Sequence, residues 1–206
     1  MIVKNFDVNW DKVGELIPAI IQDSYTLQVL MMGYMNKDSL QQTCDTGKVT
    51  FYSRTKQRLW VKGETSGNTL DVVDILSDCD GDTLLVLAKP NGFTCHLGVQ
   101  SCFGEKNIFG LGYLSALESL IEERYQKRPE NSYVTKLFEE GGHRIAQKVG
   151  EEGVEVALAS VMGEKDNVKK ETADLLFHIL VLLKYSHIGL VEVLMELQAR
   201  DNRKMG

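Results

Sequence analysis

Acidic side chains alternate with a cysteine and a glycine in the segment DCDGD, which consists of Asp78, Cys79, Asp80, Gly81 and Asp82. In an extended backbone the three carboxylates would lie on one side and the thiol on the other. A calcium-binding loop is excluded, because that motif requires glycine where Thr83 stands and glutamate where Lys89 stands. The segment therefore predicts oxygen ligands for a hard cation next to a thiolate that binds a softer one.

Two further cysteines, Cys95 and Cys102, complete a C-x15-C-x6-C pattern with Cys79. Zinc held by three protein ligands keeps its fourth position for water, which is the catalytic arrangement. His96 is then a candidate general base or fourth ligand. Structural zinc, or cysteines that are simply buried beside an Asp/Gly turn, remain alternatives. Cys44 has no evident partner and is expected in the core.

The segment SRTKQRLWVKGETSGN, residues 53–68, combines basic side chains with a Gly/Ser/Thr/Asn loop. Loops of this composition can point several backbone N–H groups at a phosphate. The segment is not a Walker P-loop, because it lacks the G-x4-G-K-[ST] pattern. A charged hairpin with a polar turn is the alternative interpretation.

Carboxylates recur at helical spacing in the second half of the chain. Glu152 and Glu155 would lie about 60° apart on one helix face, as would Glu171 and Asp174 on another. Two facing pairs would form a four-carboxylate cage, whose repulsion Mg²⁺ bridging to a pyrophosphate would relieve. An ordinary solvated helix face is the alternative, but Glu171 and Asp174 lead directly into an apolar run. His178 continues their stripe, as a functional or a core histidine.

The elements that would position these residues differ between the two halves. Six short runs rich in β-branched and aromatic residues predict strands before residue 103: PAIIQ, LQVLMM, VTFYS, RLWVK, DVVDIL and TLLVLA. A helix is predicted at residues 36–47, from Asn36 to Gly47. Helical periodicity dominates after FGEKNIFGLG, and DLLFHILVLLKY predicts a buried helix. We expect a mostly-β α+β domain at residues 1–106 and an all-α bundle at residues 107–206.

Composition restricts the class of protein. The 206 residues carry a net charge of −6, and neither half is basic, so a nucleic-acid-binding module is excluded. The opening MIVKNFDVNW has no signal-peptide pattern, and the longest apolar runs are too short to cross a bilayer. Four unevenly spaced cysteines are typical of free thiols or metal ligands. We therefore expect a cytoplasmic protein without membrane segments.

The segments SRTKQRLWVKGETSGN, DCDGD and TCHLGVQSCF, in this order, resemble phosphoribosyl-AMP cyclohydrolase of histidine biosynthesis, over roughly residues 16–104 and including LMMGYMN. The resemblance implies zinc held by Cys79, Cys95 and Cys102, with Cys79 coming from the other subunit of a homodimer. It also implies magnesium held by Asp78, Asp80 and Asp82. The candidate substrate-binding residues of the first segment are Ser53, Arg54, Trp60, Lys62, Glu64, Thr65, Ser66, Gly67 and Asn68.

The segments SYVTKLFEEGGHRIAQKVGEEGVE and ETADLLFHILVLL resemble phosphoribosyl-ATP pyrophosphohydrolase over roughly residues 112–199, within the broader all-helical MazG type. The resemblance assigns Mg²⁺ to Glu152, Glu155, Glu171 and Asp174. Glu151 is a candidate further ligand or base. The candidates for phosphate contacts are Lys136, Arg144 and Lys148. The tail LQARDNRKMG departs from the usual ending of that family, which leaves the length of the last helix open.

Together the two resemblances imply a bifunctional enzyme of histidine biosynthesis. Its C-terminal domain would hydrolyse phosphoribosyl-ATP to phosphoribosyl-AMP and pyrophosphate, and its N-terminal domain would open the adenine ring of phosphoribosyl-AMP with zinc-activated water. Three different functions remain open for the separate halves. The N-terminal half could be a zinc-stabilised binding module, and the C-terminal half could be a general nucleotide pyrophosphatase or only a dimerisation bundle.

Overall fold

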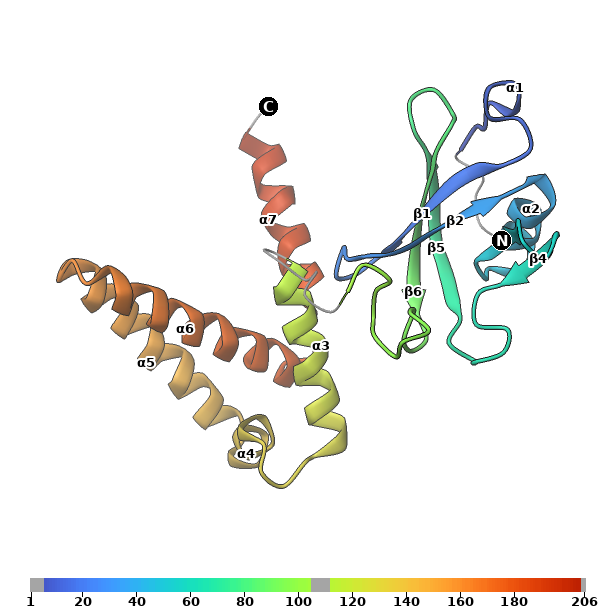
Figure 1. Cartoon of the computed structure of the whole chain (residues 1–206). Coiled ribbons are helices and arrows are strands. Elements are labelled where there is room, and N and C mark those ends of the chain that lie inside the picture. The colour runs from blue at the N-terminus through green and yellow to red at the C-terminus, as the bar shows by residue number, and fades with distance from the viewer. Residues whose placement is uncertain (1–5, 105–111, 205–206) are drawn as a thin grey trace. The chain divides into compact units, whose positions relative to one another are not determined.

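The structure is a computed structural model that describes residues 6–104 and 112–204 (Figure 1). The chain divides into two compact units, residues 1–113 and residues 114–206, and each has its own hydrophobic core. The predicted domain boundary, between residues 106 and 107, lies outside the described residues. The expected sequence of a β-rich unit followed by a helical unit is confirmed.

A four-stranded sheet in the order β2-β1-β6-β5 forms the centre of the N-terminal unit (Figure 1). The central pair, β1 and β6, is parallel, and the two outer pairs are antiparallel. A separate antiparallel hairpin contains β3 and β4. The strands are β1 (Ile17–Asp23), β2 (Val29–Met35), β3 (Thr50–Ser53), β4 (Arg58–Val61), β5 (Leu70–Ser77) and β6 (Leu84–Pro90). Each of the six predicted apolar runs forms one of these strands.

Alternation along the central strands builds the core of this unit. The side chains of β1 at Ile17, Ala19 and Ile21 are fully buried, and so are the corresponding alternate side chains of β6. Because β1 and β6 are paired in parallel register, these side chains share one face of the sheet. The register therefore fixes where β6 begins and ends, and with it the position of the loops at both ends of that strand.

The predicted helix is α2 (Lys37–Thr46), and its ends are those expected from the sequence. Asn36 and Ser39 form a reciprocal capping box, and Gly47 ends the helix with a left-handed backbone at φ 69°. Cys44 is buried in the same core, as predicted. A short helix, α1 (Trp10–Val13), was not predicted, because four residues give no periodic pattern.

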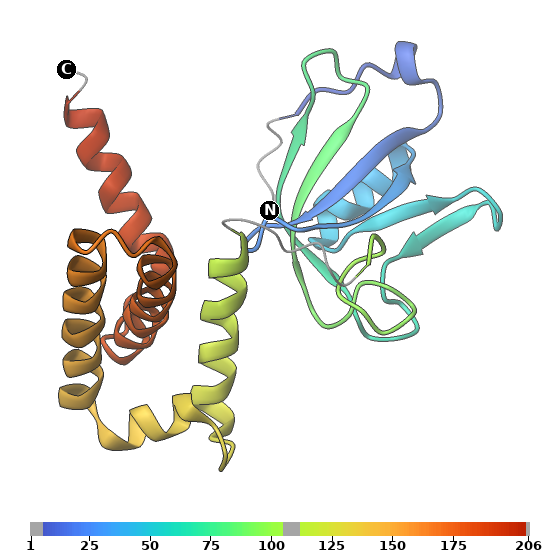
Figure 2. The ribbon, with the colours of Figure 1, turned by 60° about the vertical axis from the view of Figure 1, so that its left-hand side comes forward.

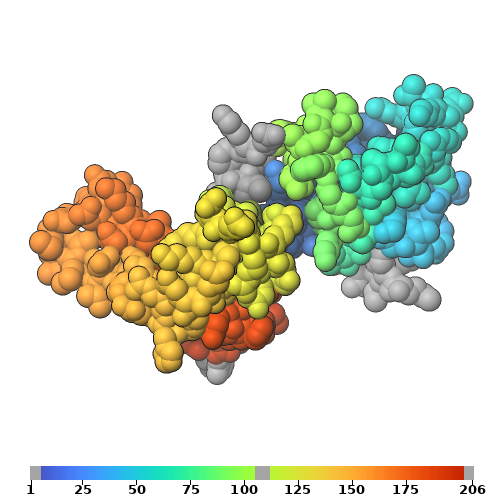
Figure 3. All heavy atoms as spheres, turned by 90° about the horizontal axis from the view of Figure 1, so that it is seen from below, coloured from blue at the N-terminus to red at the C-terminus, as the bar shows by residue number. Residues whose placement is uncertain are grey.

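The described residues of the helical part contain five helices: α3 (Gly112–Lys127), α4 (Tyr133–Glu140), α5 (Gly142–Val161), α6 (Lys165–Tyr185) and α7 (Leu190–Lys204). The two longest, α5 and α6, lie side by side and are joined by a three-residue turn (Figure 2). Their turn forms the free end of this unit (Figures 1 and 3). The all-α prediction is confirmed, and likeness to the MazG type remains a resemblance.

The prediction of a buried helix at DLLFHILVLLKY holds within the single chain for one stripe of the helix only. Only His178, Leu180 and Val181 of α6 are buried, whereas Leu176 is 42% exposed. The apolar run buries one stripe against α3, α4 and α5, and its opposite side has no cover within the described residues. An apolar run in the sequence therefore does not show by itself whether all sides of the helix are buried within the same chain.

No single helix within residues 6–104 and 112–204 is long and apolar enough to cross a membrane. The consecutive helices α6 and α7 reach that length and composition only when they are taken together, and they are bent by 105° at their junction.

Candidate functional site

A cavity of about 550 Å³ in the N-terminal unit gathers most of the predicted cyclohydrolase residues. It is of the size typical of small-molecule sites. The cavity lies between the β4–β5 connection and the loop after β6. Its lining includes Trp60, Lys62, Glu64, Thr65, Ser66, Asn68, Cys95, His96 and Cys102. Three of the predicted substrate-binding residues, Ser53, Arg54 and Gly67, do not line it. The Arg54 guanidinium instead stacks on the ring of Tyr34 at 4.1 Å.

The Cys95 and Cys102 thiols lie together in this cavity. Burial, followed by the negative charge and hydrogen bond of Cys95, raises the pKa of Cys102. The Sγ atom of Cys95 also lies 3.9 Å from Nδ1 of His96. Two adjacent thiols and an imidazole form a donor set of the kind that zinc prefers.

Lys62 supplies a positive charge beside the thiols. The side chain is buried, and its Nζ donates to the carbonyl oxygen of Asn68 at 3.1 Å. Burial lowers the pKa of Lys62, while the nearby Cys102 and Cys95 act in the opposite direction. The turn that it closes requires glycine at position 63, because a Cβ there would lie 2.3 Å from the Asn68 carbonyl oxygen.

The DCDGD segment is a turn between β5 and β6, so its backbone follows the alternative of an Asp/Gly turn and not the extended geometry considered for the carboxylates. The Asp78 carboxylate accepts from the backbone N–H groups of Asp82 at 2.9 Å and Thr83 at 3.1 Å, and this bonding closes the turn. The three aspartates nevertheless gather, with one oxygen from each within 4.8 Å of the others. The turn thus achieves the clustering that was expected from strand alternation.

An ammonium group already offsets part of the negative charge of this acidic loop. Lys12 contacts both Asp80 and Asp82, and hydrogen bonds to these two carboxylates raise its pKa. The same contact, followed by the hydrogen bond with Asp78, lowers the pKa of Asp82. Lys12 comes from α1, whose Asn9 cap donates its backbone N–H to the Gly81 carbonyl at 2.9 Å. The short helix missed from the sequence is therefore docked on the predicted metal loop.

Cys79 does not join Cys95 and Cys102 within the chain. It is exposed in the loop before β6 and borders a second cavity with Asp78 and Asp80, whereas the other two thiols follow β6 and border the first cavity. The seven residues of β6, at about 3.3 Å each, span about 23 Å. This strand separates the two loops (Figure 1). One described chain therefore presents two of the three predicted zinc ligands in one place.

In the C-terminal unit the facing helices α5 and α6 bring the predicted carboxylates together. One oxygen from each of Glu152, Glu155 and Glu171 lies within 4.8 Å of the others. The pKa of Glu171 is raised, first by burial and then by the hydrogen bond and negative charge of Glu155 and the charges of Glu152 and Asp174. Asp174 is exposed and lies outside the group of three. Such a cluster is electrostatically unfavourable until a cation enters it.

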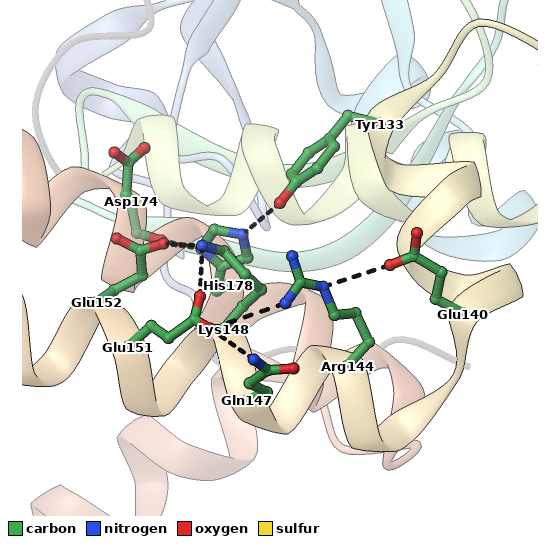
Figure 4. Close-up of polar contacts among 9 residues, drawn as sticks. All are labelled: Tyr133, Glu140, Arg144, Gln147, Lys148, Glu151, Glu152, Asp174 and His178. Atoms are coloured by element: carbon green, nitrogen blue, oxygen red, sulfur yellow. Dashed lines mark hydrogen bonds and ion pairs between the residues drawn. The ribbon is translucent and has the colours of Figure 1, made fainter.

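Basic residues of α5 lie near Glu152, the member of this cluster that Figure 4 shows. The Lys148 ammonium lies 2.8 Å from Oε2 of Glu151 and 2.9 Å from Oε1 of Glu152, contacts that raise the pKa of Lys148. Arg144 bridges Glu140 at 3.4 Å and Glu151 at 3.7 Å. Lys136 is more peripheral, because it is exposed and lies 3.8 Å from Glu140. Three predicted phosphate contacts thus share one network of ion pairs.

Sequence reasoning missed three members of this network: Tyr133, Glu140 and Gln147. Gln147 donates to Glu151 at 2.7 Å, and the Tyr133 hydroxyl lies 3.1 Å from Nε2 of His178. A signal for Gln147 was present, since it precedes Glu151 by one helical turn. Tyr133 and Glu140 lie on α4, and only the packing of α4 against the other helices shows their proximity.

Comparison with known proteins matches both units. A family model described as phosphoribosyl-AMP cyclohydrolase matches residues 31–104, and one described as phosphoribosyl-ATP pyrophosphohydrolase matches residues 114–201. Three relatives, each named histidine biosynthesis bifunctional protein HisIE, match along nearly the whole chain. The protein from Photobacterium profundum is 50% identical over 95% of this chain and 97% of its own length. The protein from Escherichia coli K12 is 52% identical over 94% and 95%.

The third relative, from Bacteroides thetaiotaomicron, is 49% identical over 95% of this chain and 97% of its own length. The two family models match the units separately, whereas these relatives match both units in the same order within one chain. The chain therefore belongs to the family of bifunctional histidine-biosynthesis enzymes, in which a phosphoribosyl-AMP cyclohydrolase domain precedes a phosphoribosyl-ATP pyrophosphohydrolase domain.

Proposed function

We propose that the C-terminal unit hydrolyses phosphoribosyl-ATP at the carboxylate cluster between α5 and α6. Water adds to phosphorus, the phosphoanhydride bond breaks, and phosphoribosyl-AMP and pyrophosphate are the products. The observation that carries this proposal is the gathering of Glu152, Glu155 and Glu171 oxygens within 4.8 Å from two helices. Oxygen donors in this arrangement fit Mg²⁺, which would neutralise phosphate oxygens and lower the pKa of the attacking water. Asp174, one turn beyond Glu171, is the proposed fourth carboxylate.

The basic residues of the network would hold the triphosphate. Arg144 and Lys148 are paired with Glu140, Glu151 and Glu152, and each can exchange part of that pairing for phosphate oxygens. Glu151 is the proposed further ligand or base. Its pKa is lowered, first by the hydrogen bond from Lys148, so it is ionised at neutral pH and able to accept a proton. Lys136 would act at longer range because it is exposed.

We propose that the N-terminal unit opens the adenine ring of phosphoribosyl-AMP in the cavity that contains Cys95, His96 and Cys102. Water adds to the ring carbon between N1 and N6, and a carbon–nitrogen bond of the ring then breaks. Zinc on the thiols would supply a Lewis acid that makes water nucleophilic near neutral pH. His96 is placed to move a proton at the cavity wall, and the polar side of the cavity formed by Thr65 and Ser66 would receive the 5′-phosphate.

The separation of Cys79 from the other two thiols supports a zinc site shared between two copies of the chain. Cys79 is exposed, as a ligand offered to a second copy must be. The adjacent aspartates, Asp78, Asp80 and Asp82, are the proposed Mg²⁺ ligands, and Lys12 would have to leave Asp80 and Asp82 for the ion to bind. A homodimer located in the cytoplasm, acting on small molecules rather than nucleic acid, completes the proposal.

Metal removal and restoration tests both assignments. The full chain is supplied with phosphoribosyl-ATP, and pyrophosphate and the ring-opened product are followed after treatment with a chelator. We expect Mg²⁺ alone to restore pyrophosphate release, and ring opening to require zinc in addition. A chelated protein that releases pyrophosphate at its original rate would contradict the C-terminal proposal. Ring opening that never returns in folded protein would favour a zinc-stabilised binding module.

Substrate range and a single variant distinguish the proposed C-terminal activity from a general pyrophosphatase and from a dimerisation bundle. A general pyrophosphatase would hydrolyse ordinary nucleoside triphosphates as efficiently as phosphoribosyl-ATP. A dimerisation bundle would leave pyrophosphate release unchanged when Asp174 is replaced by alanine. We expect neither result.

A further inference from the structure

We propose that His178 is a positioning residue of the pyrophosphohydrolase site, acting as an imidazole with its proton on Nδ1 that holds both the Glu152 carboxylate and the α6 turn of Asp174 in place. The inference deepens the proposed function and rests on it. His178 lies on α6, is buried, and touches residues from α4 and α5 as well as its own helix (Figure 4).

The hydrogen-bond partners determine the tautomer. Nδ1 of His178 lies 2.9 Å from the backbone carbonyl oxygen of Asp174. A carbonyl only accepts, so Nδ1 must carry a hydrogen atom. Nε2 lies 3.1 Å from the Tyr133 hydroxyl, which can donate to it. Both ring nitrogens of a neutral imidazole are then satisfied. The Asp174 carbonyl, which can only accept, selects the tautomer, and the Tyr133 hydroxyl donates to the nitrogen that this tautomer leaves without a hydrogen atom.

The same nitrogen edge of the ring faces a candidate metal ligand. Nδ1 lies 3.7 Å from Oε1 of Glu152, and the Lys148 ammonium lies 2.9 Å from that oxygen. Glu152 is buried, so water cannot replace a hydrogen-bond partner that its carboxylate loses when the side chain rotates. Such a loss is energetically costly. Lys148 holds this oxygen directly, and the edge of the imidazole, in contact beyond hydrogen-bond distance, limits the space into which the carboxylate can turn. The carboxylate therefore stays in the cluster with Glu155 and Glu171.

His178 is also linked to the second predicted ligand of α6, but through the backbone. Its Nδ1–H bond to the Asp174 carbonyl spans one helical turn, so movement of the imidazole is transmitted to the turn that carries the Asp174 side chain. The rings of Phe177 and Tyr133 pack around the imidazole, with centroids at 5.1 Å and 6.0 Å from it. Partners behind metal ligands typically change metal affinity about 10–100-fold when they are removed.

The test uses the full chain with Tyr133→Phe, His178→Asn and His178→Leu. Tyr133→Phe removes only the hydroxyl that donates to Nε2. In His178→Asn the side-chain amide can still donate to the Asp174 carbonyl, whereas His178→Leu keeps bulk without a donor. Tyr125→Phe is the matched control, because Tyr125 is a tyrosine of the same helical core that packs on Phe138.

Two measurements distinguish positioning from packing. Long-range ¹H–¹⁵N correlation spectra of the metal-free protein identify the His178 tautomer, and we expect Nδ1 protonated in the wild type and the Nε2 signal shifted in Tyr133→Phe. The Mg²⁺ concentration for half-maximal pyrophosphate release should rise about 10-fold or more in His178→Leu, with partial rescue in His178→Asn. The turnover at saturating Mg²⁺ should change much less than the Mg²⁺ requirement, and Tyr125→Phe should match the wild type.

Three results would overturn the inference. They are an Nε2-protonated ring, an unchanged Mg²⁺ requirement in folded His178→Leu, or an equal rise in Tyr125→Phe. If His178→Leu does not fold, Tyr133→Phe decides the question. A Tyr133→Phe variant in which both the Nε2 signal and the Mg²⁺ requirement are unchanged is then sufficient to overturn the inference. Wild-type protein without Mg²⁺-dependent pyrophosphate release would instead refute the proposed function, and the inference with it. Normal release with unaltered variants would refute the positioning role alone.

Discussion

The Nζ atom of Lys148 lies 2.9 Å from Oε1 of Glu152, so an internal cation contacts one carboxylate of the α5–α6 cluster. The contact is local, since both residues lie on α5 and are separated by four positions. It neutralises one end of the cluster and leaves the other end, at Glu155 and Glu171, without such a partner among the contacts of the described residues. The raised pKa of Glu171 is the electrostatic consequence.

Protons and Mg²⁺ should therefore compete at Glu171. Because burial and neighbouring carboxylates raise its pKa above the usual 4.5, the metal-free native state binds this proton more tightly than the unfolded state. Stability of the metal-free helical unit should then fall as pH rises from about 4.5 through the raised pKa. Unfolding by urea between pH 4.5 and 7.5, with and without Mg²⁺, measures this effect.

We expect Mg²⁺ to remove the loss of stability and Glu171→Gln to remove the dependence on pH. Asp166→Asn is the matched control, since Asp166 is an exposed acidic residue of the same helix whose ion pair within the described chain is with Lys169. A Glu171→Gln profile identical to that of the wild type would show that another group is responsible.

Removal of Lys12 should strengthen metal binding at the acidic loop. Its ammonium contacts Asp80 and Asp82, so Lys12→Met removes a competing cation while retaining most of the side-chain bulk. We expect the affinity of this loop for Mn²⁺, followed by electron paramagnetic resonance, to increase a few-fold, since exposed ion pairs are worth about 1 kcal/mol or less.

Lys37→Met is the control for that measurement. Lys37 borders the cavity lined by Asp78, Cys79 and Asp80, but its ammonium lies over the Trp10 ring and not on the aspartates. The Glu171→Gln background weakens the second Mn²⁺ site and simplifies the titration. Weaker Mn²⁺ binding in Lys12→Met would contradict this prediction. It would mean that Lys12 helps the site by docking α1 on the loop more than its positive charge repels the ion.

Mixing two inactive variants should restore ring opening if zinc is shared between copies. Cys79→Ser and Cys102→Ser each lack one ligand, but a mixed dimer can pair the intact Cys95 and Cys102 of one chain with Cys79 of the other. Random exchange in a twofold dimer should recover about a quarter of the wild-type ring-opening rate. Cys44→Ala, mixed in the same way, is the control for handling. Full activity of Cys79→Ser alone, or no recovery in proven mixed dimers, would contradict the shared site.

Gly33→Ala should destabilise the N-terminal unit without direct damage to either site. A Cβ at Gly33 would lie 2.4 Å from the Phe51 ring, which is almost fully buried beneath β2. Overpacking of this kind costs about 1–3 kcal/mol. Denaturant unfolding measures the loss, and Gly150→Ala, in open space on α5, is the control. A Gly33→Ala variant as stable as the wild type would show that the Phe51 ring can move aside.

Elements with a clear local signal could be predicted from the sequence. The strand at Ile17–Asp23 contains a short apolar run rich in β-branched residues, and Asn36 and Gly47 mark the ends of α2 by well-defined capping chemistry. The carboxylates of α5 could be grouped because helical spacing alone places Glu152 and Glu155 on one face. These are local relationships, which a single segment encodes.

Relationships between segments could not be predicted in the same way. The DCDGD segment clusters its carboxylates through a turn that Asp78 closes, and no strand period describes that geometry. The docking of Lys12 on Asp80 spans 68 positions, and Tyr133 meets His178 across 45. Contacts of this kind depend on how elements pack. The exposure of α6 at Leu176 could not be predicted for the same reason, because the sequence of an apolar helix does not show which elements pack on each side of it.

The most direct test of two separate sites supplies phosphoribosyl-ATP to Asp174→Ala and Cys102→Ser and follows both products. Asp174→Ala should lose pyrophosphate release yet open the ring of added phosphoribosyl-AMP at the wild-type rate. Cys102→Ser should release pyrophosphate normally and accumulate phosphoribosyl-AMP. If either single substitution eliminated both reactions in folded protein, the assignment of one reaction to each unit would be wrong.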